Sequence, residues 1–152
     1  MWSEDITNAA WASVGAPTKT ANSVAWIDGN TVADTLTANG NNEGIEQDLG
    51  VAAASQEYGF SFWAKRNGGS NVAATITLEG VGGTPETTTN NITVTDTWTR
   101  FHHWKNFTAA ATGNIMVKLT IDTSGESIYV CGLMAENRYD GTYGHCTKIP
   151  SP

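Results

Sequence analysis

The sequence is poor in basic residues and has no long apolar run. Lys and Arg together number 8 against 15 Asp and Glu, which gives a net charge of -7 and a pI near 4.7. Nucleic-acid-binding proteins gather Lys and Arg on one face, so we expect no DNA or RNA partner. No stretch approaches the length of a membrane span, and residues 1–11 lack the basic and apolar regions of a signal peptide. We therefore expect neither membrane insertion nor export.

Cysteine is scarce as well. Cys131 and Cys146 are too few for a disulfide scaffold and do not have the spacing of a zinc site. Two reduced, mostly buried thiols are expected, with a single bridge between them as the alternative. His102 and His103 are adjacent, so in a strand their side chains point to opposite faces and do not chelate one ion together.

Helical periodicity is also missing, and strand signals take its place. The chain has 22 Thr, 13 Asn and 16 Gly, a bias toward strands and turns. Alternating apolar and polar residues predict strands at 31–37, 45–49, 58–65, 72–79, 115–121 and 128–134. With weaker stretches these make about eight to ten short strands, the pattern of a sandwich. The prediction is an all-β fold, a jelly-roll-like two-sheet antiparallel β-sandwich over residues 1–136, with 137–152 as a C-terminal surface tail packed on the same domain.

The stretch 58–65, YGFSFWAK, carries the clearest strand signal. Tyr58, Phe60 and Phe62 share one side of an extended backbone and are expected to face the core, whereas Trp63 lies on the other side. Whether Trp63 packs beneath a neighbour or faces outward separates the main functional hypotheses. Three other tryptophans are predicted to be core anchors, namely Trp11, Trp26 and Trp98.

The turn signals predict two hairpins and a loop. Asp28-Gly29-Asn30 is expected to close a hairpin onto 31–37, and the turn 122–127 to join 115–121 and 128–134 in another. Residues 80–91, GVGGTPETTTNN, are polar and are expected to form a mobile loop. In 98–107, WTRFHHWKNF, neither face is purely apolar, and its core face stays unassigned.

Several short motifs occur together in a familiar order: SEDITNAAW at 3–11, Asp28-Gly29, TVADTLT at 31–37, YGFSFWAK at 58–65, TWTRF at 97–101 and IYVCGLMAE at 128–136. This order resembles the carbohydrate-binding-module-like sandwich domains of tailed-bacteriophage structural proteins, and it covers nearly the whole chain before Asn137. Ile6 departs from the aromatic residue of the opening motif, and Cys131 stands where an aromatic is common. The resemblance implies a sandwich fold that serves sugar binding, capsid decoration and tail assembly alike.

The leading functional expectation is a non-enzymatic virion structural protein. The resemblance implies a capsid decoration or cement protein, assembled in the host cytoplasm, that binds the major capsid protein or another virion protein and stabilises the head. A tail or fibre accessory domain is an alternative. Symmetric capsid positions imply a homo-oligomer such as a trimer. The candidate contact residues come from the expected loop and from the tail: Thr84, Pro85, Glu86, Thr87, Tyr139, Tyr143 and Ile149.

Carbohydrate binding is the alternative function. Sugars stack their apolar C–H faces on flat aromatic rings, while amides and carboxylates bind their hydroxyl groups. Trp63, Trp104 and Tyr129 are the candidate rings, with Asn67 and Glu79 as polar partners. A sandwich core also takes up aromatic side chains, so packing is the competing explanation for each ring.

No nucleophile and base, paired acid and base, or open metal site is recognisable, so we expect no enzyme. The only cofactor considered is one structural calcium ion, which related sandwiches hold near their chain ends with oxygen ligands. Asp5, Asp28 and Glu136 are the candidate ligands. Solvated turn carboxylates are the competing explanation for all three.

Overall fold

The structure is a computed structural model that describes residues 2–3 and 5–137. In these residues the chain forms β-strands joined by turns, and no helix. The strands are β1 (Trp2–Ser3), β2 (Ala12–Val14), β3 (Thr18–Ala25), β4 (Thr31–Thr37), β5 (Glu43–Ala52), β6 (Glu57–Arg66), β7 (Val72–Gly80), β8 (Glu86–Val94), β9 (Thr99–Asn106), β10 (Asn114–Ile121) and β11 (Ser127–Asn137).

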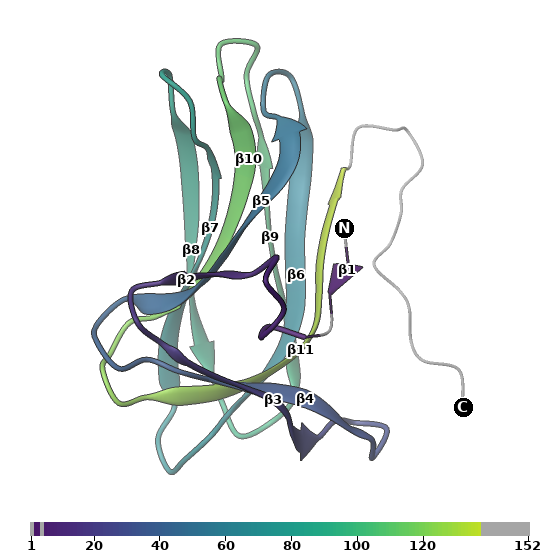
Figure 1. The fold of residues 1–152 in the computed structure, drawn as a ribbon, viewed down its shortest axis with the longest axis vertical. Helices are drawn as coiled ribbons and strands as arrows, with labels where there is room; N and C mark the ends of the chain where they lie inside the picture. The colour runs from purple at the N-terminus through teal and green to yellow at the C-terminus, as the bar shows by residue number, and fades with distance from the viewer. Residues whose placement is uncertain (1, 4, 138–152) are drawn as a thin grey trace.

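Two antiparallel sheets pack face to face. The first sheet has the order β3-β4-β11-β6-β9, and β1 pairs with the second half of β11 beyond the end of β4. The second sheet has the order β2-β5-β10-β7-β8. In Figure 1 the β3–β4 hairpin lies at the bottom, β8 lies beside β7 at the upper left, and β1 lies beside β11 on the right. The predicted jelly-roll-like β-sandwich is confirmed.

The core lies between the inner faces of the two sheets. The expected strand pattern at 58–65 is confirmed in β6, where Phe60 and Phe62 are almost fully buried and their ring centroids lie 5.5 Å apart. Trp11 packs on Phe60 at 6.0 Å, and Phe101 packs on Phe62 at 5.9 Å. Burying one such side chain stabilises a fold by about 1.5–3 kcal/mol. This aromatic row therefore holds the first sheet against the second.

One predicted hairpin is present and the other is wrong. Asp28-Gly29-Asn30 does join β3 and β4, which pair in antiparallel fashion. The strands β10 and β11 instead lie in different sheets, β10 between β5 and β7 and β11 between β4 and β6. The turn 122–127 therefore crosses from one sheet to the other. The alternation of each strand gives its buried face, but it does not give the neighbour.

The strand β11 changes its buried face half-way along. Ile128 and Val130 face the core as predicted, but the pairing with β6 shifts between Cys131 and Met134. Gly132 has a φ of 60°, a conformation that glycine adopts without strain. After this bulge Leu133 and Ala135 are buried. The alternation predicted over 128–134, which would put Gly132 and Met134 on the core face with Ile128 and Val130, is therefore wrong beyond Cys131.

The predicted mobile loop 80–91 is largely a strand. β7 ends at Gly80, a short turn follows, and from Glu86 onward β8 pairs with β7 along its whole length. Thr87, Thr88 and Thr89 are polar, but threonine is β-branched and favours extended backbone. The polar composition indicated solvent exposure, and the exposure arises from an edge strand.

The unassigned stretch 98–107 forms β9, with Phe101, His103 and Lys105 on its inner side. Phe107, just beyond the strand, is buried. Two of the predicted core tryptophans are not in the core: Trp26 and Trp98 are only half-buried, whereas Trp11 is 3 % exposed as expected. No helix of the described residues is long and apolar enough to cross a membrane.

Candidate functional site

The outer face of the first sheet gathers most of the candidate sugar-binding residues. Trp63 alternates along β6 with the buried Phe62 and Ala64, so it faces away from the core. The strand register places Trp104 opposite Gly59 and Tyr129 opposite Lys65, on this same outer side. We call this surface the aromatic face. Its rings are Trp26, Trp63, Trp104 and Tyr129.

Trp63 is held in place by a second tryptophan. The ring of Trp26, from the end of the β3–β4 hairpin, meets the ring of Trp63 edge to face, with centroids 6.4 Å apart and planes inclined by 68°. Beneath them Gly132 leaves only a hydrogen where a Cβ would lie 3.6 Å from Trp63 Cδ1. Trp63 is therefore half-buried and fixed in orientation, which favours a rigid stacking platform.

Tyr129 is anchored by a chain of hydrogen bonds. Its hydroxyl group donates to Asn67 Oδ1 at 2.8 Å, and Asn67 Nδ2 donates to Ser127 Oγ at 3.2 Å. Ser127 Oγ lies 2.9 Å from the hydroxyl oxygen of Thr37. Asn67 thus lies beside Tyr129 at the aromatic face, and it positions the phenol ring. The chain connects β4, β11 and the turn after β6.

The β9 side of the aromatic face is more open and partly charged. Trp104 has 50 % of its surface exposed. Opposite Trp63 in the register, Arg100 donates from a guanidinium nitrogen to Ser61 Oγ at 3.1 Å. His102 lies between Arg100 and Trp104 on β9 and is exposed. Flat rings, a guanidinium group and hydroxyl groups thus share one surface, a combination that suits a polyhydroxylated ligand.

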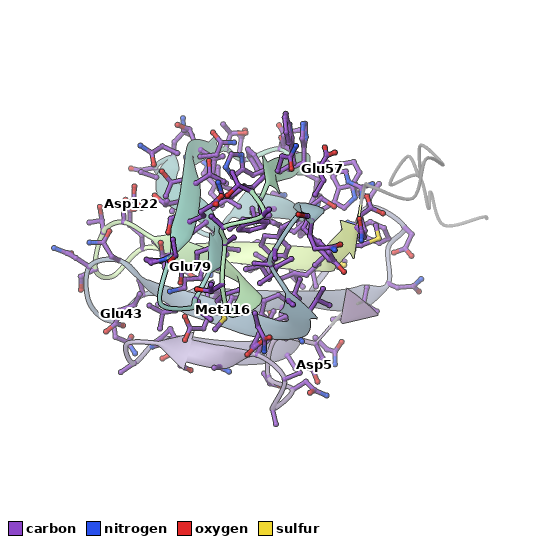
Figure 2. The ribbon with its side chains drawn as sticks, turned by 90° about the horizontal axis from the view of Figure 1, so that it is seen from above. Asp5, Glu43, Glu57, Glu79, Met116 and Asp122 are labelled. Carbon is purple, nitrogen blue, oxygen red and sulfur yellow. The ribbon has the colours of Figure 1, made fainter. Side chains whose placement is uncertain are left out.

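Glu79 is not part of this face. It lies on β7, on the outer side of the second sheet, next to Met116 in Figure 2. Its carboxylate is 2.5 Å from Lys118 Nζ, and Glu46 contacts the same ammonium group at 3.3 Å. Burial disfavours the charged form of Lys118, but both carboxylates outweigh that effect and raise its pKa. Glu79 therefore stabilises an ion-pair cluster, and the prediction that it joins the sugar-binding rings is wrong.

The predicted contact segments are only partly described. Thr84 and Pro85 are exposed in the turn between β7 and β8, and the backbone N–H of Thr84 donates to Thr112 Oγ1 at 2.8 Å. Glu86 opens β8 and pairs with Lys105 at 3.3 Å, and Thr87 faces outward beside it. The other candidates lie outside the described residues, namely Tyr139, Tyr143 and Ile149. Cys146 also lies outside them, while Cys131 is buried.

The expected calcium ligands do not assemble among the described residues. No group of three His, Cys, Asp or Glu side chains is close enough there to hold a metal ion. Asp5 instead accepts hydrogen bonds from the backbone N–H and the hydroxyl group of Thr7, which lower its pKa. Asp28 accepts the backbone N–H of Asn30 at 2.9 Å. Asp5 and Asp28 therefore each stabilise their own turn, and turn carboxylates were the competing explanation for a calcium site.

Asp34 on β4 is a buried carboxylate. Its two oxygens accept the backbone N–H groups of Ile6 at 2.7 Å and Asn22 at 2.8 Å. Burial raises the pKa of Asp34, and the two N–H donors oppose this rise. The side chain ties the first residues and the bulge of β3 to β4, so its role is to fix the hairpin that carries Trp26.

Sequence reasoning missed Trp26, Arg100 and Ser61. Trp26 was assigned to the core because it is apolar and follows a strand. Arg100 and Ser61 follow from the outward position of Trp63, since Ser61 is two residues away on β6 and Arg100 is opposite Trp63 on β9. The alternation of β6 contained this signal, but the β6–β9 pairing was needed to use it.

No protein-family model matches the sequence, and no curated protein sequence matches it. Solved structures share its fold. The C-terminal family 22 carbohydrate-binding module of Clostridium thermocellum Xyn10B has a TM-score of 0.71 at 14 % identity, over 90 % of this chain and 91 % of that chain. The CBM22-1 xylan-binding domain of Paenibacillus barcinonensis Xyn10C has a TM-score of 0.69 at 14 % identity, over 84 % and 85 %. The fold is that of these carbohydrate-binding modules.

A bacteriophage protein has the same fold in part of its length. The enzymatically active domain of tailspike protein 4 of bacteriophage CBA120 has a TM-score of 0.61 at 15 % identity. The match covers 85 % of this chain and 19 % of that chain. At such identities a structural likeness establishes the fold alone.

Proposed function

We propose that this chain is a non-catalytic carbohydrate-binding module that holds a glycan on the aromatic face. The observation that carries this proposal is the position of Trp63, which is directed away from the core and is fixed edge to face against Trp26. A ring that served only to fill the core would be directed inward. The fold, shared with xylan-binding modules, supports the same assignment.

The chemistry of the face fits a neutral, extended sugar chain. Trp63, Trp104 and Tyr129 come from three adjacent strands of the sheet, with Tyr129 opposite Lys65 and Trp104 opposite Gly59 of β6. An oligosaccharide that runs diagonally over the strands therefore meets one ring after another. Arg100 and Asn67 supply nitrogen donors for hydroxyl groups along this path. Stacking holds the sugar without activating any bond, so no catalytic group is needed.

Xylohexaose is the first probe, because structural neighbours of this fold bind xylan, and one is complexed with xylohexaose. Calorimetric titration and a glycan array are expected to show saturable binding. Trp63→Ala is expected to weaken it at least about tenfold, because an aromatic contact and its buried area are lost. Met116→Ala is the matched control, since Met116 lies on the outer face of the other sheet and is expected to leave binding unchanged.

A xylan chain is one of several possible ligands, so the array decides the sugar. Binding of a different glycan that also depends on Trp63 supports the proposal. Absence of binding to every neutral glycan, or binding that Trp63→Ala leaves intact while the fold is kept, contradicts it.

A second candidate function is attachment to a bacteriophage particle, either as a capsid decoration protein that binds the major capsid protein or as a tail component. It rests on the ordered motifs that resemble phage structural proteins and on the tailspike neighbour. The structural neighbours support carbohydrate binding better than capsid decoration. Mass spectrometry of purified particles separates the two: many copies of this chain on the virion support attachment, and its absence from particles contradicts it.

A further inference from the structure

The strand β8 is an open edge of the second sheet. It is 9 residues long, and it pairs with β7 from Gly80 opposite Glu86 to Val72 opposite Val94 without a register shift. Figure 1 shows it at the upper left, beside β7. Within the part of the chain that the structure describes, no other strand pairs with its outer backbone edge. A regular strand of this kind presents a row of N–H and C=O groups to solvent.

The other sheet edges carry features that prevent pairing with a further strand. β2 has only 3 residues. β3 is interrupted by register shifts and by Asn22, which has a φ of 48°. β9 carries two cationic side chains, Arg100 and Lys105. Short strands, bulges and charged side chains, lysine above all, are the known ways to block an edge.

β8 is neither short nor bulged, and it contains no Pro and no Lys. Its single charge, Glu86, is at its first residue, on the inner side of the strand opposite Gly80. That carboxylate is already engaged, because it accepts hydrogen bonds from Thr108 and pairs with Lys105 at 3.3 Å. The hydroxyl group of Thr88 lies 3.1 Å from His103 Nε2, which fixes β8 to β9 across the sandwich. The strand is therefore a straight and rigid template.

We propose that β8 pairs with β8 of a second copy of this chain, in antiparallel register, to form a two-fold dimer. The sequence of the strand suits self-pairing. Centred on Asn90, the register sets Thr87 opposite Thr93, Thr89 opposite Asn91 and Glu86 opposite Val94, so no like charges meet. An isologous pair uses the same edge of both copies and then closes, because each copy has already given its β8 edge to the two-fold contact.

The dimer geometry follows from the parity of the register. Residues of equal parity face each other, so outward side chains of one β8 continue those of the other, and the two five-stranded sheets become one continuous sheet. The two-fold axis then runs perpendicular to this sheet, and the aromatic faces of both copies look in the same direction. The inference does not depend on glycan binding, but it predicts bivalent binding of a polymer if the proposed function holds.

The test is sedimentation of the full chain over a wide range of concentrations. A monomer–dimer equilibrium is expected. Thr89→Lys/Asn91→Lys is expected to raise the dimer dissociation constant about tenfold or more, because lysines are set opposite lysines. Thr75→Lys/Thr77→Lys places the same charge on β7, one strand inward, where Thr75 and Thr77 lie opposite Asn91 and Thr89 of β8. This variant is expected to leave the dimer intact.

A charge swap gives an independent measurement. Thr89→Glu/Asn91→Glu is expected to be monomeric alone and to form a heterodimer when mixed with the double-lysine variant, as native mass spectrometry detects. Circular dichroism verifies that each variant is folded. A chain that stays monomeric at every concentration overturns the proposal, and so does a dimer that the β8 lysines do not weaken.

Discussion

The rings of Trp26 and Trp63 meet edge to face at 6.4 Å, although 37 positions separate them in the sequence (63 minus 26). One comes from the β3–β4 hairpin and the other from the middle of the first sheet. Their contact joins the part of the fold that Asp34 stabilises to the surface that we propose binds sugar. The first prediction concerns this pair.

Removing either tryptophan is expected to reduce the contribution of the other to the free energy of unfolding. In a double-mutant cycle with Trp26→Ala and Trp63→Ala, urea unfolding is expected to show a coupling free energy of about 0.5–1.5 kcal/mol, the usual range for an edge-to-face aromatic pair. Trp26→Ala is also expected to reduce glycan affinity, because Trp63 loses its support. A coupling energy of zero contradicts a structural role for the contact. Replacing the exposed Trp104 with Ala provides the control for loss of a ring outside the pair.

Asp34→Asn is expected to destabilise the fold by about 1–3 kcal/mol. Both carboxylate oxygens accept backbone N–H groups, so the amide substitution sets an NH2 group against an N–H donor. Asp96→Asn is the matched control, because Asp96 is largely exposed and pairs with Arg66 only at 3.6 Å, and a change within about 0.5 kcal/mol is expected there. Equal effects in the two variants, measured by urea unfolding, argue against the anchoring role of Asp34.

Gly132→Ala is expected to cost about 1–2 kcal/mol of unfolding free energy. The added Cβ meets Trp63 at an ordinary contact distance of 3.6 Å, so the cost arises from the positive φ of 60° rather than from a clash. Gly69→Ala serves as control, since a Cβ at Gly69 meets no atom within 4 Å and its φ is not in the left-handed region. Thermal unfolding of both variants measures the difference. A Gly132→Ala protein as stable as the control speaks against the bulge as a constraint.

The protein is expected to lose stability as the pH falls, and part of this loss is expected to come from His103. Burial, and then the charge of His102, lower the pKa of His103 below its ordinary value of 6.5. Because the folded state holds the proton less tightly than the unfolded state, the contribution of His103 is complete above pH 6.5 and is lost as the pH falls through the lowered pKa. In His103→Gln, urea unfolding is expected to show a smaller loss of stability over this window. His102→Gln, at the exposed neighbouring position, is the comparison. An identical pH profile in wild type and His103→Gln refutes the assignment.

Local alternation predicted the inner faces of most strands correctly. Side-chain direction follows from the strand period alone. Buried as predicted are Phe60 and Phe62 in β6, the alternate positions of β7 from Val72 to Leu78, and the alternate positions of β10 from Ile115 to Ile121. The same reasoning failed at β11, where one residue in the left-handed region shifts the period. It also failed at β8, where a polar composition was taken for a loop.

The candidate site was half predicted. Trp63, Trp104, Tyr129 and Asn67 do share one face, although nothing local to any of them showed that they meet. Glu79 was predicted to be a polar partner of these rings, but β7 belongs to the other sheet. Trp26 was left out because it was predicted to be a core anchor.

The sequence by itself determined the class of fold, the inner wall of β6 and the position of Trp63 on the opposite side of that strand, since these follow from residue type and a period of two. Only the tertiary structure decided that β10 and β11 part into different sheets, that Trp26 supports Trp63, and that β8 is left as an open edge. Each of these depends on which strands become neighbours. That choice is set by long-range pairing and packing between sheets, and the pattern within a single strand does not encode it.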